Sequence, residues 1–220
     1  MILVSLSDIH ENVPGLKAIR HELQAADVVL LCGDLTSFGG AEHAARVVGA
    51  VRQINDRVFA VPGNCDRPPV DAYLSEQGIN LHGRSQVVGG LRLIGLGGSL
   101  PALSPTPFEF TDDQLAHFLR DAMSGFADDG LPLVLLSHQP PRDTAADLAF
   151  TGGHVGSAAV RSFIEQQRPL VCFTGHIHEG RGIDEIGVTK VINPGPFRTG
   201  RYAYAEIAGE LKALEIRGGR

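Results

Sequence analysis

Short runs rich in Val, Ile and Leu recur along the whole chain, and no other feature of the sequence constrains the fold as strongly. Most of these runs are four to six residues long and often end in Gly, Asp, His or Pro, which is typical of β-strands rather than helices. We expect strands at residues 2–6, 28–32, 58–61, 91–96, 133–136, 170–174, 190–192, 203–207 and 211–216. A chain with so many short strands is expected to bury them in layered sheets.

Helical patterns separate several of these strands. Apolar residues at spacings of three and four predict helices over residues 14–26, 41–54, 112–125 and 157–167. Pro14 lies near a helix start, and Thr111 and Ser157 are suitable N-caps. Strand and helix alternate in the first half, and the last third is mostly strands with tight Gly turns. We therefore expect an α/β fold with mixed sheets, in a single domain over residues 1–220.

Composition excludes several classes of protein. No apolar stretch approaches the roughly 20 residues that span a bilayer, and the first residues lack a basic leader, so we expect a cytoplasmic protein that does not interact with membranes. A net charge of −6 with only three Lys residues argues against non-specific binding to nucleic acid. The three cysteines are far apart and form no CxxC pair, so neither a disulfide framework nor a structural zinc site is indicated.

Potential metal ligands follow the predicted strands at the same kind of position. They are Asp8, His10, Asp34, Asn64, His138, His176 and His178. Ligands in open α/β sheets gather at the carboxyl ends of the strands, so we expect these side chains to meet there. The pairs Asp8/His10 and His176/His178 are spaced i, i+2, which on an extended backbone directs two side chains to the same side. Glycines at positions 33, 63 and 175 precede three of the ligands and would let the backbone turn without crowding them.

The chemistry of this ligand set selects a class of metal. Four imidazoles, two carboxylates and one amide oxygen suit Mn, Fe, Zn, Co or Ni rather than an all-oxygen calcium site. Hydrolases with two metals hold the ions about 3.5–4 Å apart and commonly share a carboxylate between them. Asp34 is our candidate for that bridge. We therefore expect two divalent ions as cofactors, with Mn²⁺ favoured.

The motifs together resemble those of the calcineurin-like metallophosphoesterases. The family pattern is DxH, GD, GN, H and GHxH, which here correspond to Asp8-Ile9-His10, Gly33-Asp34, Gly63-Asn64, His138 and Gly175-His176-Ile177-His178. The resemblance implies a four-layer α/β/β/α sandwich with two mixed sheets. It also implies that one metal is held by Asp8, His10, Asp34 and His178, and the other by Asp34, Asn64, His138 and His176. A metal-bridging hydroxide would then attack phosphorus in line with the leaving group.

The sequence departs from the family pattern at one position. Many members have His after the Asn of the GN motif, and this His is thought to protonate the leaving oxygen or to bind the phosphate. Here the motif continues with Cys65 and Asp66. A thiol is a weaker proton donor at neutral pH than an imidazolium, so the identity of the general acid stays open. The candidate catalytic residues are Asp34, Asn64, Cys65 and Asp66, although Cys65 is also explained as a wall of the site and Asp66 as a cap or as support for a neighbour.

Other residues have candidate roles around this centre. Asn64, Arg67 and His154 are the candidate substrate-binding residues, because Arg can fork onto phosphate oxygens and His154 lies in a glycine-rich loop. Equally, Arg67 and His154 can be ordinary loop residues. The segment 97–110, with three prolines, is a candidate rim or lid. Polar surroundings predict surface positions for His21, His43, His82 and His117.

The function that these features favour is hydrolysis of a small, nucleotide-like phosphodiester. Two alternatives keep hydrolysis: a phosphomonoesterase, and a nuclease, although the chain lacks the basic track that nucleic acid requires. A third is a non-catalytic scaffold on the same fold, but in such relatives the ligand histidines are partly lost, whereas this chain keeps them. The expected partner is a small phosphoester substrate, and a homo-oligomer is expected on general grounds.

Overall fold

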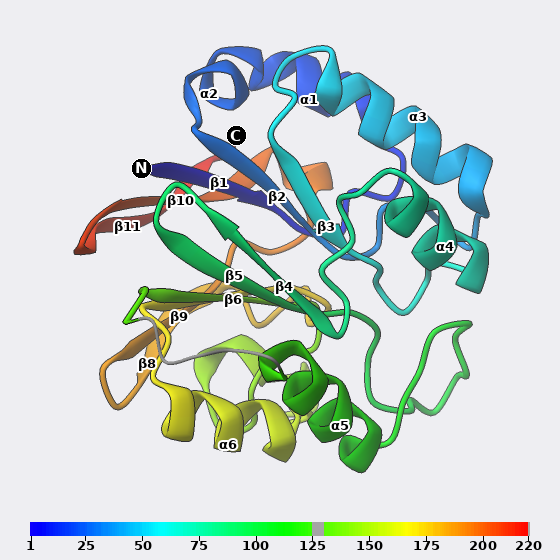
Figure 1. Ribbon diagram of the computed structural model, residues 1–220. Helices are drawn as coiled ribbons and strands as arrows, with labels where there is room; N and C mark the ends of the chain where they lie inside the picture. The colour runs from blue at the N-terminus through cyan, green and yellow to red at the C-terminus, as the bar shows by residue number, and fades with distance from the viewer. Residues whose placement is uncertain (125–129, 220) are drawn as a thin grey trace.

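The strands assemble into two sheets that face each other at the centre of the molecule (Figure 1). The computed structural model describes residues 1–124 and 130–219. The first sheet has the order β11 (Glu210–Gly218), β10 (Arg201–Ala208), β1 (Ile2–Leu6), β2 (Val28–Cys32) and β3 (Val58–Val61). Strands β1, β2 and β3 are parallel, and β10 is antiparallel to both of its neighbours. The mixed sheet that the sequence predicts is confirmed here.

The second sheet is also mixed, with a parallel centre and antiparallel edges. Its order is β4 (Arg84–Val88), β5 (Leu91–Leu96), β6 (Leu133–Ser137), β7 (Val171–Thr174), β9 (Thr189–Asn193) and β8 (Gly182–Ile186). Strands β5, β6, β7 and β9 run parallel, whereas β4 and β8 pair antiparallel at the two edges. Parallel strands place their carboxyl ends at one edge of a sheet, and this property brings distant loops together.

Helices cover the outer face of each sheet, so the molecule has four layers (Figure 1). The first sheet is covered by α1 (Val13–Ala18), α2 (Arg20–Ala25), α3 (Ala41–Arg52) and α4 (Pro68–Glu76), and the second by α5 (Asp112–Met123) and α6 (Ala158–Gln167). Short 3₁₀ turns, η1 (Ala145–Asp147) and η2 (Phe197–Thr199), lie in the loops. The four-layer α/β/β/α architecture is therefore confirmed.

The period of two along a strand divides the core between the layers. In β2, Leu30 and Cys32 face the second sheet, whereas Val29 and Leu31 face the helices that cover the first sheet. In β7, Phe173 faces the central layer and Cys172 faces α5 and α6. Each fully buried Leu or Phe side chain contributes about 2 kcal/mol to the free energy of unfolding. Strands buried on both faces explain why their sequences are continuous apolar runs.

Three elements escape the sequence patterns. Strands β4 and β8 are edge strands with many exposed positions, so their apolar signal is weak. Helix α4 begins at two prolines and was not predicted. The helix expected over residues 14–26 is broken at Ile19, whose backbone leaves the helical region. Helix α5 ends at Met123, and the predicted end at residue 125 lies outside the described residues.

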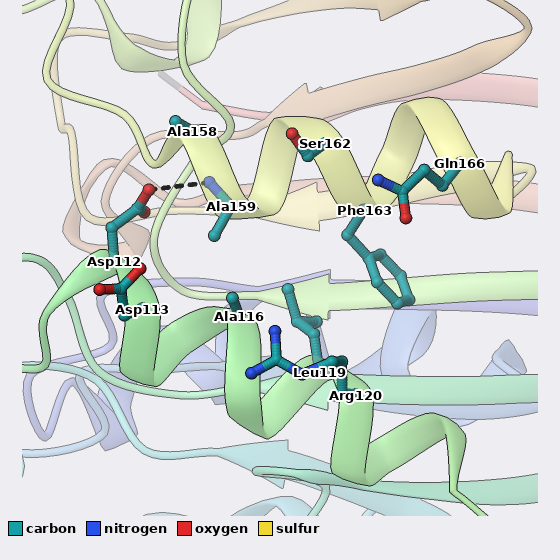
Figure 2. A pocket seen from close by; sticks show the side chains of 10 residues that line it. All are labelled: Asp112, Asp113, Ala116, Leu119, Arg120, Ala158, Ala159, Ser162, Phe163 and Gln166. Atoms are coloured by element: carbon teal, nitrogen blue, oxygen red, sulfur yellow. Dashed lines mark hydrogen bonds between the residues drawn. The ribbon is translucent and has the colours of Figure 1, made fainter.

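The two helices that cover the second sheet, α5 and α6, are connected by a hydrogen bond between their N-terminal turns. Thr111 caps α5 in a capping box, and Ser157 caps α6, as the sequence predicts. The Asp112 carboxylate of α5 accepts a hydrogen bond of 3.0 Å from the Ala159 backbone N–H of α6 (Figure 2). Between the helices lies a groove of about 340 Å³ that Arg120 and Gln166 help to line, and it contains none of the predicted ligands.

No helix of residues 1–124 or 130–219 is long and apolar enough to cross a membrane.

Candidate metal centre

The predicted ligands meet where the carboxyl ends of the two sheets adjoin. Asp8, Asp34 and Asn64 follow β1, β2 and β3 of the first sheet, and His138 and His176 follow β6 and β7 of the second. Potential ligand atoms of Asp8, His10 and His178 lie within 4.8 Å of one another, and so do those of Asp8, Asp34 and His138. The structure thus brings five of the seven predicted ligands into two adjoining groups.

The remaining two ligands contact the second group through His138. Its Nε2 atom lies 3.0 Å from the Asn64 amide oxygen, and its ring centroid lies 5.3 Å from that of His176. Asp34 lies between the groups, with Oδ2 3.7 Å from His10 Nε2 and Oδ1 3.5 Å from His138 Nε2. That position suits the bridge predicted for Asp34, although Asp8 is the residue common to both groups.

The ligand loops have a left-handed backbone, which corrects the extended geometry expected from the sequence. The φ angles are 54° at Asp8, 45° at His10, 49° at Asp34 and 64° at His176. Each such residue costs roughly 1–2 kcal/mol, and strain of this kind persists only where the surroundings enforce it. The Asp8/His10 pair therefore converges through a tight turn, because an extended segment would carry the chain away from the sheet edge.

Two glycines let the ligand loops approach each other. A Cβ atom on Gly63 would lie 2.1 Å from both the backbone nitrogen and the Oδ1 atom of Asp34. A Cβ atom on Gly33, whose φ is +81°, would lie 2.2 Å from the His138 ring. No real Cβ contact is this short, so both positions require Gly, as predicted.

The donor set around His138 fits a cation. The Nδ1 atom of His138 lies 2.8 Å from the Cys32 carbonyl oxygen, and because a carbonyl can only accept, Nδ1 donates to it. On the other side of the ring, Nε2 faces the Asn64 amide oxygen at 3.0 Å and the Asp34 carboxylate at 3.5 Å, both of which are acceptors. A metal ion placed among these three atoms could take the Nε2 lone pair and both oxygens as ligands.

Two consecutive hydrogen bonds from segment 97–110 set the orientation of the Asn64 amide. Thr106 Oγ1 donates to the Glu109 carboxylate at 2.7 Å, so the same oxygen accepts from the Asn64 Nδ2–H at 3.1 Å. This contact directs the amide nitrogen away from His138 and leaves the amide oxygen facing it. Segment 97–110 therefore forms a rim that orients a ligand, which agrees with the rim predicted there.

The other group also contains an unsatisfied ligand atom. Asp8 Oδ1 is buried and accepts no hydrogen bond from any described residue, although His178 Nε2 lies 3.3 Å away. The second oxygen, Oδ2, is held by the Ser7 hydroxyl at 2.5 Å and the His176 N–H at 3.2 Å. His10 Nδ1 faces the Thr36 carbonyl oxygen at 3.2 Å, which leaves His10 Nε2 free to bind. A cation beside Asp8 would occupy this open coordination position.

Protonation states follow from burial and from these neighbours. Burial by itself raises the pKa of Asp8, but the His178 ring 3.3 Å from Oδ1 and the charges of His138 and His178 hold it well below the usual range. Burial, helped by the charge of His138, lowers the pKa of His176 to about 3. The Asp8 carboxylate, 3.3 Å from His178 Nε2, raises the pKa of His178. Asp8 is thus a carboxylate and His176 a neutral imidazole at neutral pH, the forms that bind metals.

Cys65 and Asp66 have different positions in the site. The Cys65 N–H donates to Asp34 Oδ1 at 2.8 Å, and burial together with the Asp34 charge raises the pKa of the thiol. The thiol therefore stays protonated and forms part of the wall. Asp66 is fully buried and accepts hydrogen bonds from the backbone N–H groups of Leu35, Thr36 and Gly63. Through these backbone groups it joins the Asp34 loop to the Asn64 loop.

The candidate substrate residues and outlying histidines lie further out. Arg67 is exposed and precedes α4, and among the described residues its side chain forms no hydrogen bond or ion pair with a ligand. His154 is partly exposed and binds the buried Asp147 carboxylate at 2.7 Å, so it supports a loop. The surface position predicted for His82 is wrong, because its ring packs against Phe108, Phe110 and Phe118. Polar sequence neighbours concealed this contact, which forms only when α5 folds over the loop.

Several supporting residues had no sequence signal. Ser7, Thr36, Thr106 and Glu109 contact ligands directly or at one remove. The buried Asn193 donates from Nδ2 to the carbonyl oxygens of Ile177, Gly175 and Ala146 at 2.8, 3.4 and 3.4 Å. Only proximity in sequence to a ligand could have suggested Ser7 and Thr36.

Comparison with known proteins agrees with this geometry. Residues 1–180 match the model of the calcineurin-like phosphoesterase family. The uncharacterized protein MJ1162 of Methanocaldococcus jannaschii is 34% identical over 202 residues, which cover 89% of this chain and 88% of that protein.

Solved structures share the fold at lower identity. TT1561 of Thermus thermophilus has a TM-score of 0.76 at 19% identity, with 100% of this chain and 99% of that chain covered. A purple acid phosphatase from yellow lupin seeds has a TM-score of 0.63 at 13% identity, covering 99% of this chain and 51% of that one. With its family match over most of the chain and candidate metal ligands at the strand ends, the chain belongs to the calcineurin-like phosphoesterases, a family of metal-dependent hydrolases.

Proposed function

We propose that this protein is a phosphodiesterase that cleaves a small, nucleotide-like diester with two divalent metal ions, of which Mn²⁺ is the first choice. One ion would be held by Asp8, His10, Asp34 and His178, and the other by Asp34, Asn64, His138 and His176. The observation that carries the proposal is the convergence of His138 Nε2, the Asn64 amide oxygen and the Asp34 carboxylate, three potential metal ligands from three different loops. A mixed set of imidazole and oxygen donors suits Mn²⁺ and its transition-metal neighbours.

The charges of the ligand set favour an anionic substrate. When bound, two divalent ions polarise a phosphate and activate water as a nucleophile. Two carboxylates, Asp8 and Asp34, and four neutral imidazoles leave such a centre with a net positive charge, which attracts a phosphate. In the overall reaction, the oxygen of water bonds to phosphorus, the P–O bond to one alcohol breaks, and that alcohol departs with a proton. The other proton of water is released to solvent.

The protein offers no strong acid at position 65. Because burial and Asp34 raise the pKa of the Cys65 thiol, this group releases its proton poorly. The leaving alcohol would then take its proton from solvent, which is easiest when the alcohol is a good leaving group. This limitation supports an activated diester as the preferred substrate over a monoester of a simple alcohol.

The test is metal-restored hydrolysis by chelator-stripped protein. Bis(p-nitrophenyl) phosphate and p-nitrophenyl phosphate are supplied with Mn²⁺, Ni²⁺, Zn²⁺, Co²⁺ or Mg²⁺ added singly. We expect Mn²⁺ to restore cleavage of the diester more strongly than that of the monoester. Asn64→Ala and His176→Ala should lower kcat/KM about 100-fold or more, because each removes a ligand of the second ion.

A matched control separates ligand loss from general damage. His117 has a side chain 61% exposed on α5 and far in the sequence from any ligand, so His117→Ala should leave the rate unchanged. Undiminished turnover in Asn64→Ala and His176→Ala would contradict the proposal. Tight binding of two ions with no hydrolysis of either ester would favour a scaffold role instead.

A further inference from the structure

A second cavity opens directly beside the candidate metal centre. It has a volume of about 410 Å³, within the usual range for small-molecule sites, and His178 forms part of its wall. Arg181, Arg198 and Arg201 also line it, together with Phe150 and Glu179. A ligand that binds at His178 therefore has continuous access to this cavity.

The three arginines give the cavity a positive charge. Among the residues that the structure describes, none of the three forms an ion pair, whereas Arg46, Arg161 and Arg217 elsewhere on the surface do. Of the described residues that line the cavity with them, Glu179 alone carries a carboxylate. A local excess of positive charge in a chain with a net charge of −6 attracts anions to this place. Unpaired guanidinium groups suit phosphate oxygens, onto which they fork.

The stem of one arginine is held in place by the loop below it. The side chain of Arg181 lies over Gly195, where an added Cβ would meet Arg181 Cβ at 3.5 Å and Cδ at 3.6 Å. The Asn193 side-chain oxygen in turn accepts the Gly195 N–H at 2.8 Å. Arg198 lies within the turn η2 that follows this loop, and Arg201 begins β10 directly after it. Two of the three guanidinium groups thus extend from the segment that begins at the buried Asn193.

An exposed aromatic ring completes the wall. Phe150 lies at the tip of a tight hairpin, in which Leu148 pairs with His154 and the Ala149 N–H donates to the Gly153 oxygen at 3.0 Å. Its side chain is 90% exposed, yet its backbone N–H is held by Glu179 at 2.9 Å. The base of the hairpin is anchored by the buried Asp147 carboxylate. An aromatic ring presented on an anchored loop is a surface on which a planar base can stack.

We infer that this cavity recognises the part of the substrate that is not cleaved, and that this part is a planar base joined to at least one further phosphate. The inference rests on the proposed function and narrows its substrate to nucleotides that carry a phosphate beyond the one attacked. The arginines bind the additional phosphate, Phe150 stacks on the base, and the scissile phosphate lies at the metal ligands beyond His178. No bond changes within the cavity itself.

The test measures binding of ADP, AMP, adenosine and pyrophosphate to the Mn²⁺-loaded protein by isothermal titration at fixed ionic strength and free Mn²⁺. We expect ADP to bind about tenfold more tightly than AMP, with adenosine weaker than either. Arg181→Ala, Arg198→Ala and Arg201→Ala should each weaken ADP about tenfold and AMP much less. Phe150→Ala should weaken ADP several-fold and leave pyrophosphate unchanged.

Two control variants exclude general effects of charge and apolar area. Arg52→Ala removes a partly exposed arginine of α3, which bonds to Gln77, and Leu103→Ala removes a fully exposed apolar side chain of the 97–110 rim. Neither should alter the affinity for ADP. Equal affinities for ADP and AMP, or arginine variants that bind ADP like the parent protein, would overturn the inference. Pyrophosphate that binds as tightly as ADP would overturn the role of the base.

The binding assay and the hydrolysis assay can fail separately. If the chromogenic diester is cleaved but the arginine variants bind ADP normally, the proposed hydrolysis is supported and the assignment of the cavity is wrong. If ADP binds in an arginine-dependent manner but no ester is cleaved with any metal, the cavity assignment stands and the proposed hydrolysis is wrong.

Discussion

The two halves of the metal centre are supported by buried side chains of opposite chemistry. In the half built on the first sheet, the Asp66 carboxylate accepts hydrogen bonds from backbone N–H groups of the Asp34 and Asn64 loops. In the half built on the second sheet, the Asn193 amide donates to backbone carbonyl oxygens of the loop that carries His176 and His178. Each side chain satisfies backbone groups that the left-handed ligand turns leave without partners.

The difference between the two supports is charge, and charge makes one of them sensitive to pH. Burial and the nearby Asp34 raise the pKa of Asp66 to about 6, although the hydrogen bonds from Gly63 and Thr36 act in the opposite direction. Asn193 has no titratable group. Holding a strained loop therefore requires an acceptor where N–H groups converge and a donor where carbonyl groups converge.

Asn193→Asp tests the comparison most severely. The introduced carboxylate would face the carbonyl oxygens of Gly175, Ile177 and Ala146 in a fully buried position. We expect the free energy of unfolding at pH 7 to fall by about 4 kcal/mol, because a buried charge is left without a partner. The folded-state pKa of the new carboxyl would be raised, so the lost stability should return as the pH falls and the group becomes a donor. Urea titrations at pH 5 and pH 7 measure both effects, and equal losses at both pH values would contradict the argument.

His82 also holds a loop by accepting a backbone hydrogen bond, but its ring is neutral and becomes charged in acid. Its Nδ1 atom accepts the Gly97 N–H at 2.9 Å, and burial, partly opposed by the charge of Asp71, lowers its pKa to about 4. The folded-state pKa thus lies below the unfolded value of about 6.5, and the stability contributed by the neutral ring is present above pH 6.5 and lost as the pH falls toward 4.

The variant His82→Asn isolates this effect. Its side-chain oxygen can replace Nδ1 as the acceptor for Gly97, but the amide does not titrate. Between pH 6.5 and pH 4 we expect the parent protein to lose about 3 kcal/mol of unfolding free energy relative to the variant. Parallel stability curves for the two proteins over this range would show that the ring is not held neutral.

Asp66→Asn addresses the charged support directly. Whichever way the amide is turned, its NH₂ group meets backbone N–H donors of Leu35, Thr36 or Gly63. The loss of charge relieves burial and the repulsion from Asp34, so we expect a modest loss of about 2 kcal/mol in unfolding free energy. Metal-restored hydrolysis should nevertheless fall about 100-fold, because the Asp34 and Asn64 loops lose their common anchor. Asp113→Asn, an exposed carboxylate of α5, is the control, and equal activity in both variants would remove Asp66 from the positioning role.

The sequence predicts the centre of each sheet well and the edges poorly. Strands β1, β2, β3 and β5 begin and end where the apolar runs do, because strands buried on both faces leave no ambiguity of period. Strands β4 and β8 face solvent at sheet edges, so they lack such runs.

The ligands could be recognised from the sequence because residue type and position after a strand are local features. The residues that support them could not be recognised in this way. Asp8 and His10 are recognisable by type and by position after a strand. The contacts of Asn193 with residue 177 and of Thr106 with residue 64 depend on loops that meet only in the folded chain. The left-handed turns could not be predicted either, since Asp and His tolerate that conformation without requiring it.

The smallest changes in unfolding free energy are expected from substitutions at two glycines, one in the crowded ligand loops and one in a surrounding helix. Gly63→Ala would force a Cβ atom to within 2.1 Å of the Asp34 backbone nitrogen, so we expect a loss of about 1–2 kcal/mol in unfolding free energy and a clear fall in metal affinity. Gly49→Ala in α3 places its Cβ where nothing lies within 4 Å, and better helix propensity should raise the unfolding free energy by about 0.5–1 kcal/mol. Denaturant titrations and metal titrations of both variants measure this contrast. Equal responses at the two positions would show that the ligand loops are less tightly packed than the contacts of Gly63 imply, and the strain at Asp34 would then need another cause.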